Sequence, residues 1–170
     1  MKPHLHFYRM LLMVAIGAVC INAQLKLGAS TSLGPVWLLG GRVGLASRDR
    51  YKPQPFLDVS FNPVPERRMF RLNELEYLQL RERRVLVSAG ITERLMSSRY
   101  PVGLDAELSL GFFSGWYRGS DRDFREEFTP IAAIGPVFGQ GPARLSVRYQ
   151  WFRMQSSNMH ACSLVLEWSL

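Results

Sequence analysis

Apolar and polar residues alternate along several short stretches of this chain, most clearly in RLSVRYQW (144–151). Leu145, Val147, Tyr149 and Trp151 share one side of this stretch, and Arg144, Ser146, Arg148 and Gln150 share the other. A period of two is typical of a β-strand with one apolar and one polar face. This stretch therefore predicts a strand that separates two unlike environments.

The same pattern recurs along the chain. We expect strands at Leu25–Thr31, Val36–Ala46, Phe56–Phe61, Val85–Ile91, Leu104–Phe112, Phe128–Phe138, Arg144–Trp151 and Cys162–Leu170. Phe128–Phe138 contains Pro130 and Pro136, so we expect irregular ends there. Met69–Leu80 is rich in Leu and Glu, and it fits either a strand or a helix beginning near Asn73. Since bacterial barrels usually have an even number of strands, we expect about eight, within a range of eight to ten.

Residues 1–23 have the features of a secretory signal peptide. A basic start precedes the apolar run 10–21, and Ala23 ends the segment. The run is shorter than the roughly 20 residues that a membrane-spanning helix needs. We therefore expect cleavage after Ala23 and one mature domain, 24–170. Lipidation of Cys20 is the less favoured alternative, because a bulky valine precedes that cysteine.

Composition narrows the fold further. Within 24–170 Cys162 is the only cysteine, so an internal disulfide cannot stabilise the domain. A closed ring of hydrogen-bonded strands would stabilise it instead. The formal net charge is +7, but the basic cluster Arg81, Arg83 and Arg84 accompanies no nucleic-acid motif. In an outer membrane, outward arginines would meet the phosphates of lipopolysaccharide.

Charged residues of both signs occupy the polar phase of the strands, and aromatic residues gather near strand ends. The first feature predicts a lumen in which charges of opposite sign neutralise one another. The second predicts girdles of aromatic residues at the two membrane interfaces. We thus expect an all-β fold: a closed antiparallel up-and-down transmembrane β-barrel. The predicted lumen-facing network is Arg42, Asp58, Asp105, Glu107, Arg144, Arg148 and Glu167. The predicted lipid-facing residues are Leu145, Val147, Tyr149, Leu164, Leu166 and Trp168.

The segments LNELEYLQL (Leu72–Leu80), VSAG (Val87–Gly90) and RLSVRYQW carry a family resemblance. With them, the chain resembles the PorT-like outer-membrane β-barrel families of Gram-negative bacteria over most of 24–170. The resemblance implies a fold and a location in the bacterial outer membrane, and it implies no catalytic residues. Barrels of this kind commonly end in Phe or Trp, whereas this chain has Trp168 two residues before Leu170.

The sequence offers little enzyme chemistry. His160, Ser163 and Glu167 include the residue types of a lipid A deacylase, but His160 has the opposite strand phase to the other two. No His or Cys spacing suggests zinc, and no cofactor motif is present.

The connections between the strands differ in length. GQGP (139–142) predicts a tight turn, whereas Ser114–Glu127 and Met154–His160 predict longer loops at the opposite, outward end.

We therefore expect a small outer-membrane barrel with a side-chain-filled lumen and a structural or accessory role, and not a general porin or an enzyme. Its expected partners are outer-membrane lipid, lipopolysaccharide and the barrel-assembly machinery, without nucleic acid. Two alternatives remain: a soluble periplasmic or secreted β-fold that binds an apolar ligand, and a lipid-modifying barrel enzyme. Arginine at Ser146 should be tolerated better than arginine at Val147, because the lumen offers acidic partners.

Overall fold

The computed structural model describes residues 24–46, 52–71, 76–96, 102–118, 120, 126–139, 141–154 and 157–170. The predicted signal peptide and its cleavage site therefore lie outside the described residues. The strands are β1 (Gln24–Leu33), β2 (Leu38–Ala46), β3 (Gln54–Phe61), β4 (Glu66–Arg71), β5 (Tyr77–Met96), β6 (Val102–Arg118), β7 (Glu127–Phe138), β8 (Ala143–Met154) and β9 (Ser157–Ser169). Among these residues no helix has the length and apolarity that a membrane-spanning helix requires.

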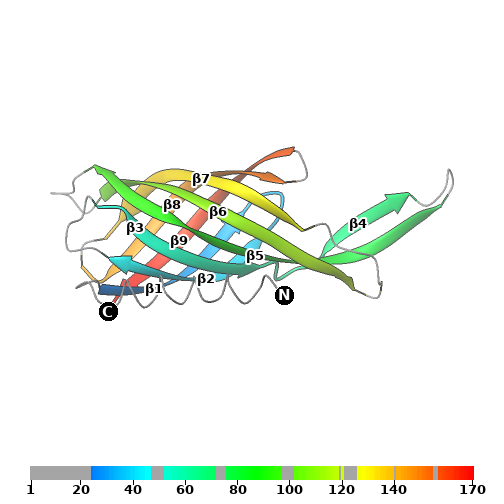
Figure 1. Cartoon of the computed structure of the whole chain (residues 1–170), viewed down its shortest axis with the longest axis horizontal. Helices are drawn as coiled ribbons and strands as arrows, with labels where there is room; N and C mark the ends of the chain where they lie inside the picture. The colour runs from blue at the N-terminus through cyan, green and yellow to red at the C-terminus, as the bar shows by residue number, and fades with distance from the viewer. Residues whose placement is uncertain are drawn as a thin grey trace, which may run out of the picture.

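The strands form one antiparallel sheet in the order β3-β2-β1-β9-β8-β7-β6-β5-β4, and an additional pairing of β3 with β5 closes it. Eight strands thus make a ring, and β4 stands outside it (Figure 1). The first and last strands are neighbours in the ring, with Lys26 opposite Ser169 and Leu33 opposite Cys162. This arrangement confirms the predicted all-β, up-and-down barrel of about eight strands.

The barrel has two ends. The terminal end is where β1 begins, where β9 ends and where the β7–β8 turn lies. In that turn Gly139 and Gly141 have φ angles of 117° and 110°, a region of backbone space that favours glycine. The distal end carries the β1–β2 turn, the β8–β9 turn and the start of β4. The predicted tight turn at GQGP is therefore at the opposite end from 114–127, as expected.

Strand β5 takes part in two structures. Its second part pairs with β3 in the ring, from Phe61↔Val85 to Gln54↔Thr92. Its first part pairs with β4, from Glu66↔Glu82 to Arg71↔Tyr77. We name the three-stranded projection beyond the ring the distal extension: Glu66–Arg71, Tyr77–Arg84 and the end of β6, 116–118. It projects beyond the distal end of the barrel in Figure 1.

Asn62 joins the ring to the distal extension and is 1% exposed. Its backbone N–H donates to the Arg84 carbonyl at 3.1 Å, and its side-chain oxygen accepts from the Arg84 N–H at 2.7 Å. Its amide nitrogen donates to the Glu82 carbonyl at 3.1 Å. These bonds satisfy the β5 backbone where its partner changes from β3 to β4.

The strand pairings decide two local predictions that the sequence left open. Within Met69–Leu80 the residues 69–71 and 77–80 are strands, because they pair with each other across the β4–β5 hairpin. Asn73, the predicted start of a helix, lies outside the described residues. Glu127–Phe138 is one strand that pairs continuously with β6, but it pairs with β8 only at 131–134 and 137–138. Pro130 lies just before the first β7–β8 pair and Pro136 lies in the gap between Ile134 and Val137, so both prolines stand where β7 does not pair with β8.

The predicted distal loops are also shorter than expected. Met154 pairs directly with Ser157, so 154–160 is a tight hairpin and not a polar loop. Strand β6 continues to Arg118, which takes 114–118 out of the predicted loop. Both differences arise because cross-strand pairing extends strands through polar residues that sequence patterns assign to connections.

Candidate functional site: the filled interior of the barrel

A cluster of ion pairs crosses the centre of the barrel. Glu107 on β6 accepts from both terminal nitrogens of Arg42 on β2, at 2.7 and 3.2 Å. The same carboxylate accepts from Nη1 of Arg148 on β8. Arg42 also donates from Nε to Asp58 at 3.2 Å. Because these residues come from β2, β3, β6 and β8, they connect opposite walls of the ring.

The cluster continues toward the terminal end through Asp105, the next inward residue on β6. Its carboxylate accepts from Arg94 Nε at 3.0 Å and lies 3.9 Å from Arg148 Nη2. Arg42 further stacks over the Phe56 ring, with 4.0 Å from the guanidinium carbon to the ring centroid. Every charge of this central cluster therefore has an oppositely charged partner, as buried ions require.

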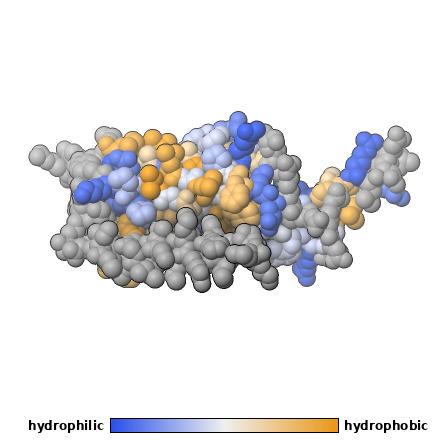
Figure 2. Space-filling view, in the orientation of Figure 1, coloured by the Kyte–Doolittle hydropathy of each residue, from blue (hydrophilic) through white to orange (hydrophobic). Residues whose placement is uncertain are grey.

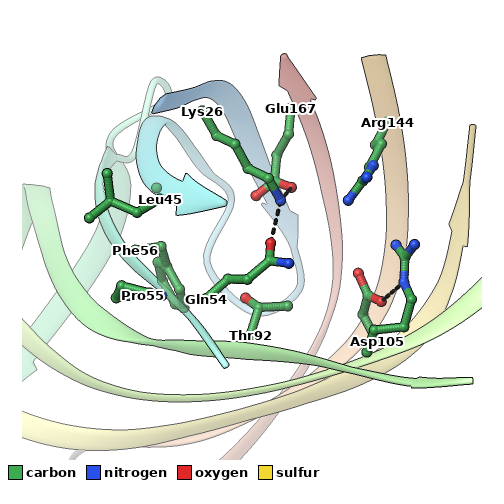
Figure 3. Close-up of a pocket in the computed structure, with 11 residues that line it drawn as sticks. Lys26, Leu45, Gln54, Pro55, Phe56, Thr92, Asp105, Arg144 and Glu167 are labelled. Atoms are coloured by element: carbon green, nitrogen blue, oxygen red, sulfur yellow. Dashed lines mark hydrogen bonds and ion pairs between the residues drawn. The ribbon is translucent and has the colours of Figure 1, made fainter. Parts of the chain in front are cut away.

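A second set of polar side chains lies at the terminal end (Figure 3). Lys26 Nζ donates to Gln54 Oε1 at 2.5 Å and lies 3.6 Å from Glu167 Oε2. Arg144 faces the same space from β8 and lies opposite Glu167 in the β8–β9 register. This region is a polar mouth that ends at the central cluster.

The distal end of the interior is closed by apolar side chains. We call this group the distal plug: Val36, Leu38, Leu86, Phe113, Ile131, Phe152, Met154 and Ala161. The rings of Phe113 and Phe152 pack with their centroids 5.9 Å apart. Phe113 is 1% exposed and Phe152 is 2% exposed. Apolar packing and the central cluster thus close the lumen at two successive levels.

The described side chains leave little free space inside the barrel. One cavity of about 20 Å³ lies among Lys26, Gln54, Arg94, Asp105 and Glu167. Another of about 30 Å³ lies on the distal side of Arg42 and Glu107. A single water needs roughly 10–15 Å³ measured in this way, so these cavities hold one or two waters each. An eight-stranded ring has an interior that side chains can fill, and here they do.

The structure places the seven predicted lumen residues on the inner face of the strands. It brings Arg42, Asp58, Asp105, Glu107 and Arg148 into the central cluster, and it places Arg144 and Glu167 at the terminal mouth. The sequence analysis missed Lys26 and Arg94 as members of the interior. Their strand phase contained the signal: Lys26 lies between the outward residues Leu25 and Leu27, and Arg94 precedes the outward residue Leu95.

One basic residue was assigned to the wrong face. Arg84, grouped at the sequence level with outward arginines, is 1% exposed and points inward. Its Nε donates to Glu82, which Arg68 also contacts at 2.7 Å. The phase of β5 explains this result, since Arg84 alternates with the outward residue Val85.

The outer face of the ring is apolar. Among the predicted lipid-facing residues, Leu145, Tyr149, Leu166 and Trp168 are 42%, 56%, 45% and 53% exposed, and Val147 and Leu164 are half-buried on the same face. Figure 2 shows apolar residues over the body of the barrel, hydrophilic residues toward its ends, and both kinds on the projection. A belt of this size on a folded domain marks an interaction surface.

His160 lies on this outer face, where its Nδ1 is hydrogen-bonded to the Tyr149 hydroxyl and the two rings stack at 5.7 Å. Ser163 and Glu167 face the interior, so the His-Ser-Glu set does not assemble. Among the described residues no group of three His, Cys, Asp or Glu side chains is placed to hold a metal ion.

The comparisons with solved structures agree on the fold. The N-terminal β-barrel domain of Pseudomonas aeruginosa OprF matches with a TM-score of 0.61 and 9% identity, covering 86% of this chain and 97% of that one. Neisserial surface protein A matches with a TM-score of 0.54 and 13% identity, covering 87% and 96%. The Yersinia pestis outer membrane protein Ail, in a phospholipid bilayer nanodisc, matches with a TM-score of 0.51 and 12% identity, covering 88% and 100%.

The fold is that of a small outer-membrane β-barrel. At these identities the likeness concerns the fold alone. No family model and no curated protein matches the sequence. The PorT-like resemblance therefore stays a prediction.

Proposed function

We propose that this protein is a sealed outer-membrane β-barrel with a structural or accessory role, and not a general porin. The observation that carries the proposal is the filled interior. Among the described residues, the interior cavities beside the central cluster measure about 20 and 30 Å³, which is too little for a continuous water path. Porins that conduct solutes need many more strands.

The outer face supports a place in a bilayer. Aromatic residues stand at both ends of the belt, with Phe138 and Trp168 at the terminal end and Trp37, Phe61 and Phe128 at the distal end. Rings that are dry on one side and wet on the other favour the two interfaces of a membrane. We propose the bacterial outer membrane as the location, with the distal end outward. Outer-membrane lipid, lipopolysaccharide and the assembly machinery are then its partners, as in the PorT-like assignment, which we retain as a proposal.

Two other functions are weaker on specific grounds. A soluble β-fold that binds an apolar ligand needs an interior cavity of about 300 Å³ or more, and the described interior lacks one. A lipid-modifying enzyme that used His160 would need a nucleophile and an acid beside the imidazole, whereas the hydrogen-bond partner of His160 is the phenol of Tyr149. We therefore propose no catalytic role.

Planar-bilayer recording tests the sealed barrel. Purified protein, folded in detergent and added to a bilayer, should give no stable conductance steps, whereas a porin in the same bilayer provides the positive control. Insertion must be checked independently, by protease protection in vesicles and by the mobility of unheated samples on gels. Stable porin-sized steps from inserted protein would overturn the sealed lumen. Monodisperse folded protein without detergent or lipid would overturn the membrane location.

A further inference from the structure

Three arginines form a row across the outer face of the distal extension. Arg67 on β4 lies directly opposite Arg81 on β5, and Arg81 lies directly opposite Arg118 on β6. All three side chains are exposed. Neighbouring strands are about 4.8 Å apart, so the row extends over roughly 10 Å. Like charges at directly opposite positions destabilise a sheet, so an isolated extension gains nothing from this arrangement.

The acids of the extension do not relieve this repulsion. Both acids in its paired part, Glu66 and Glu82, lie on the inner face. There Arg68 lies 3.5 Å from Glu66 and 2.7 Å from Glu82, and Arg84 contacts the same two carboxylates. The inner face is therefore neutral. In the part of the chain that the structure describes, Arg67, Arg81 and Arg118 have no ion-pair partner.

An apolar groove lies next to this row on the same face. Its volume is about 420 Å³, and its walls include Val59, Phe61, Val85 and Trp116. Arg83 closes the groove toward the row, held by hydrogen bonds from its Nη1 to the carbonyls of Asn62 and Pro63 at 3.0 and 2.9 Å.

The register fixes the distance between groove and row. Arg83 is opposite Trp116, and the next outward pair along these strands is Arg81 with Arg118. Two residues of strand span about 7 Å, so the cationic row lies roughly 7 Å beyond Trp116, which is 55% exposed. With Trp116 at the interface of the proposed membrane, the row would lie at the level of lipid phosphates and the groove at the level of the first acyl carbons.

We propose that the row and the groove together bind a membrane glycolipid that carries more than one phosphate. The phosphates lie along Arg67, Arg81 and Arg118, and one acyl chain lies in the groove beneath them. Guanidinium groups match phosphate oxygens in bidentate geometry, and a row of roughly 10 Å exceeds what a single phosphate needs. The adjoining groove favours an acylated ligand over a soluble anion. This inference rests on the proposed membrane location and names the lipid class involved.

Lipid titration of the folded barrel in non-ionic detergent, read by native mass spectrometry, tests the proposal. The probes are bis-phosphorylated lipid A, phosphatidylglycerol, phosphatidylcholine and inorganic pyrophosphate. Lipid A should bind most tightly. Arg81→Gln should weaken its binding about tenfold or more, since a hydrogen bond to a charged group is lost. Arg153→Gln is the matched control, because it removes an exposed arginine at the same end of the barrel, on β8.

A second pair of variants tests the groove. Val85→Phe fills it and should weaken lipid A binding without affecting pyrophosphate. Val43→Phe makes the same change elsewhere on the outer belt and should have no effect. Stability gives an independent measurement that does not depend on affinity. In phosphatidylcholine vesicles Arg81→Gln should unfold at the same or a higher urea concentration than wild type, and with lipid A this order should reverse.

The outcomes separate the two proposals. If the barrel inserts and stays sealed, but lipid A binds no better than phosphatidylglycerol or pyrophosphate, this inference is wrong and the proposed function stands. Equal losses of lipid A affinity in Arg81→Gln and Arg153→Gln would likewise reject the binding site, while the proposed sealed barrel would stand. A protein that stays folded and monodisperse without detergent would reject both.

Discussion

Glu107 holds the centre of the barrel together, and its replacement by glutamine tests that role. The change keeps the size of the side chain and removes one buried negative charge. Glu107 is 5% exposed and accepts hydrogen bonds from Arg42 and Arg148, the latter 1% exposed. In the variant Arg42 keeps Asp58 at 3.2 Å, but Arg148 keeps only Asp105, at 3.9 Å.

The expected cost follows from this loss of partners. Removing one member of a buried ion pair costs about 3–5 kcal/mol, because it leaves the other charge without compensation. The glutamine oxygen still accepts one hydrogen bond, so we expect Glu107→Gln to lower the free energy of unfolding by about 3 kcal/mol. Adding Arg148→Met removes the excess positive charge that Glu107→Gln leaves in the cluster, and it should recover part of that loss, with a coupling energy in the range of about 0.5–3 kcal/mol.

Urea unfolding in phosphatidylcholine vesicles, followed by tryptophan fluorescence, measures these values. Glu93→Gln is the control, since Glu93 is an exposed acid on the outer face of β5 and should change stability by no more than about 0.5 kcal/mol. Equal costs for Glu107→Gln and Glu93→Gln would refute the argument that the cluster depends on Glu107. A cost that Arg148→Met does not reduce would refute the pairing.

Two further predictions concern facing and processing. Ser146→Arg should destabilise the barrel more than Val147→Arg in the same unfolding assay. Ser146 is 1% exposed and accepts a hydrogen bond from Arg148 at 3.3 Å, so an arginine there would place a second cation against Arg148. Arginine on the lipid face costs roughly 2–4 kcal/mol at mid-depth. The reverse order would mean that the interior can rearrange around a new cation. The mature protein should begin at Gln24, which intact mass of protein purified from membranes measures; a lipid-modified Cys20 at the N-terminus would contradict the signal-peptide prediction.

Alternation predicted the fold and the facing of most strands, because a period of two is a property of the backbone that each strand expresses locally. Leu104–Phe112 and RLSVRYQW illustrate this, since their odd and even positions lie on opposite faces as expected. Phase alone also places Lys26, Arg84 and Arg94 inside. Extending the alternation of inward and outward residues to the full length of β1 and β5 would have predicted these three positions from the sequence alone.

The contents of the lumen were harder to predict. Which acid meets which base depends on strand order and register, and these bring Arg42 and Glu107 together from β2 and β6, 65 positions apart in sequence. For the same reason, the sequence could not show whether an arginine at position 146 would meet acidic partners, because that depends on which side chains surround Ser146 in the lumen. Strand β4 was predicted only in part, as the start of the doubtful segment Met69–Leu80, because Glu66, Arg67 and Arg68 put charges on both faces and neither face carries a clear apolar signal.

The pairing of β1 with β9 also determines when the barrel can close. The two strands that complete the ring are the first and the last of the described sequence, with Lys26 opposite Ser169. Until β9 is in place, β1 and β8 each present an unsatisfied edge that can pair with another chain. Such long-range contacts form slowly, because much of the chain must first be ordered. Aggregation therefore competes with closure for as long as these edges stay open, and a chain truncated before β9 would keep both edges open permanently.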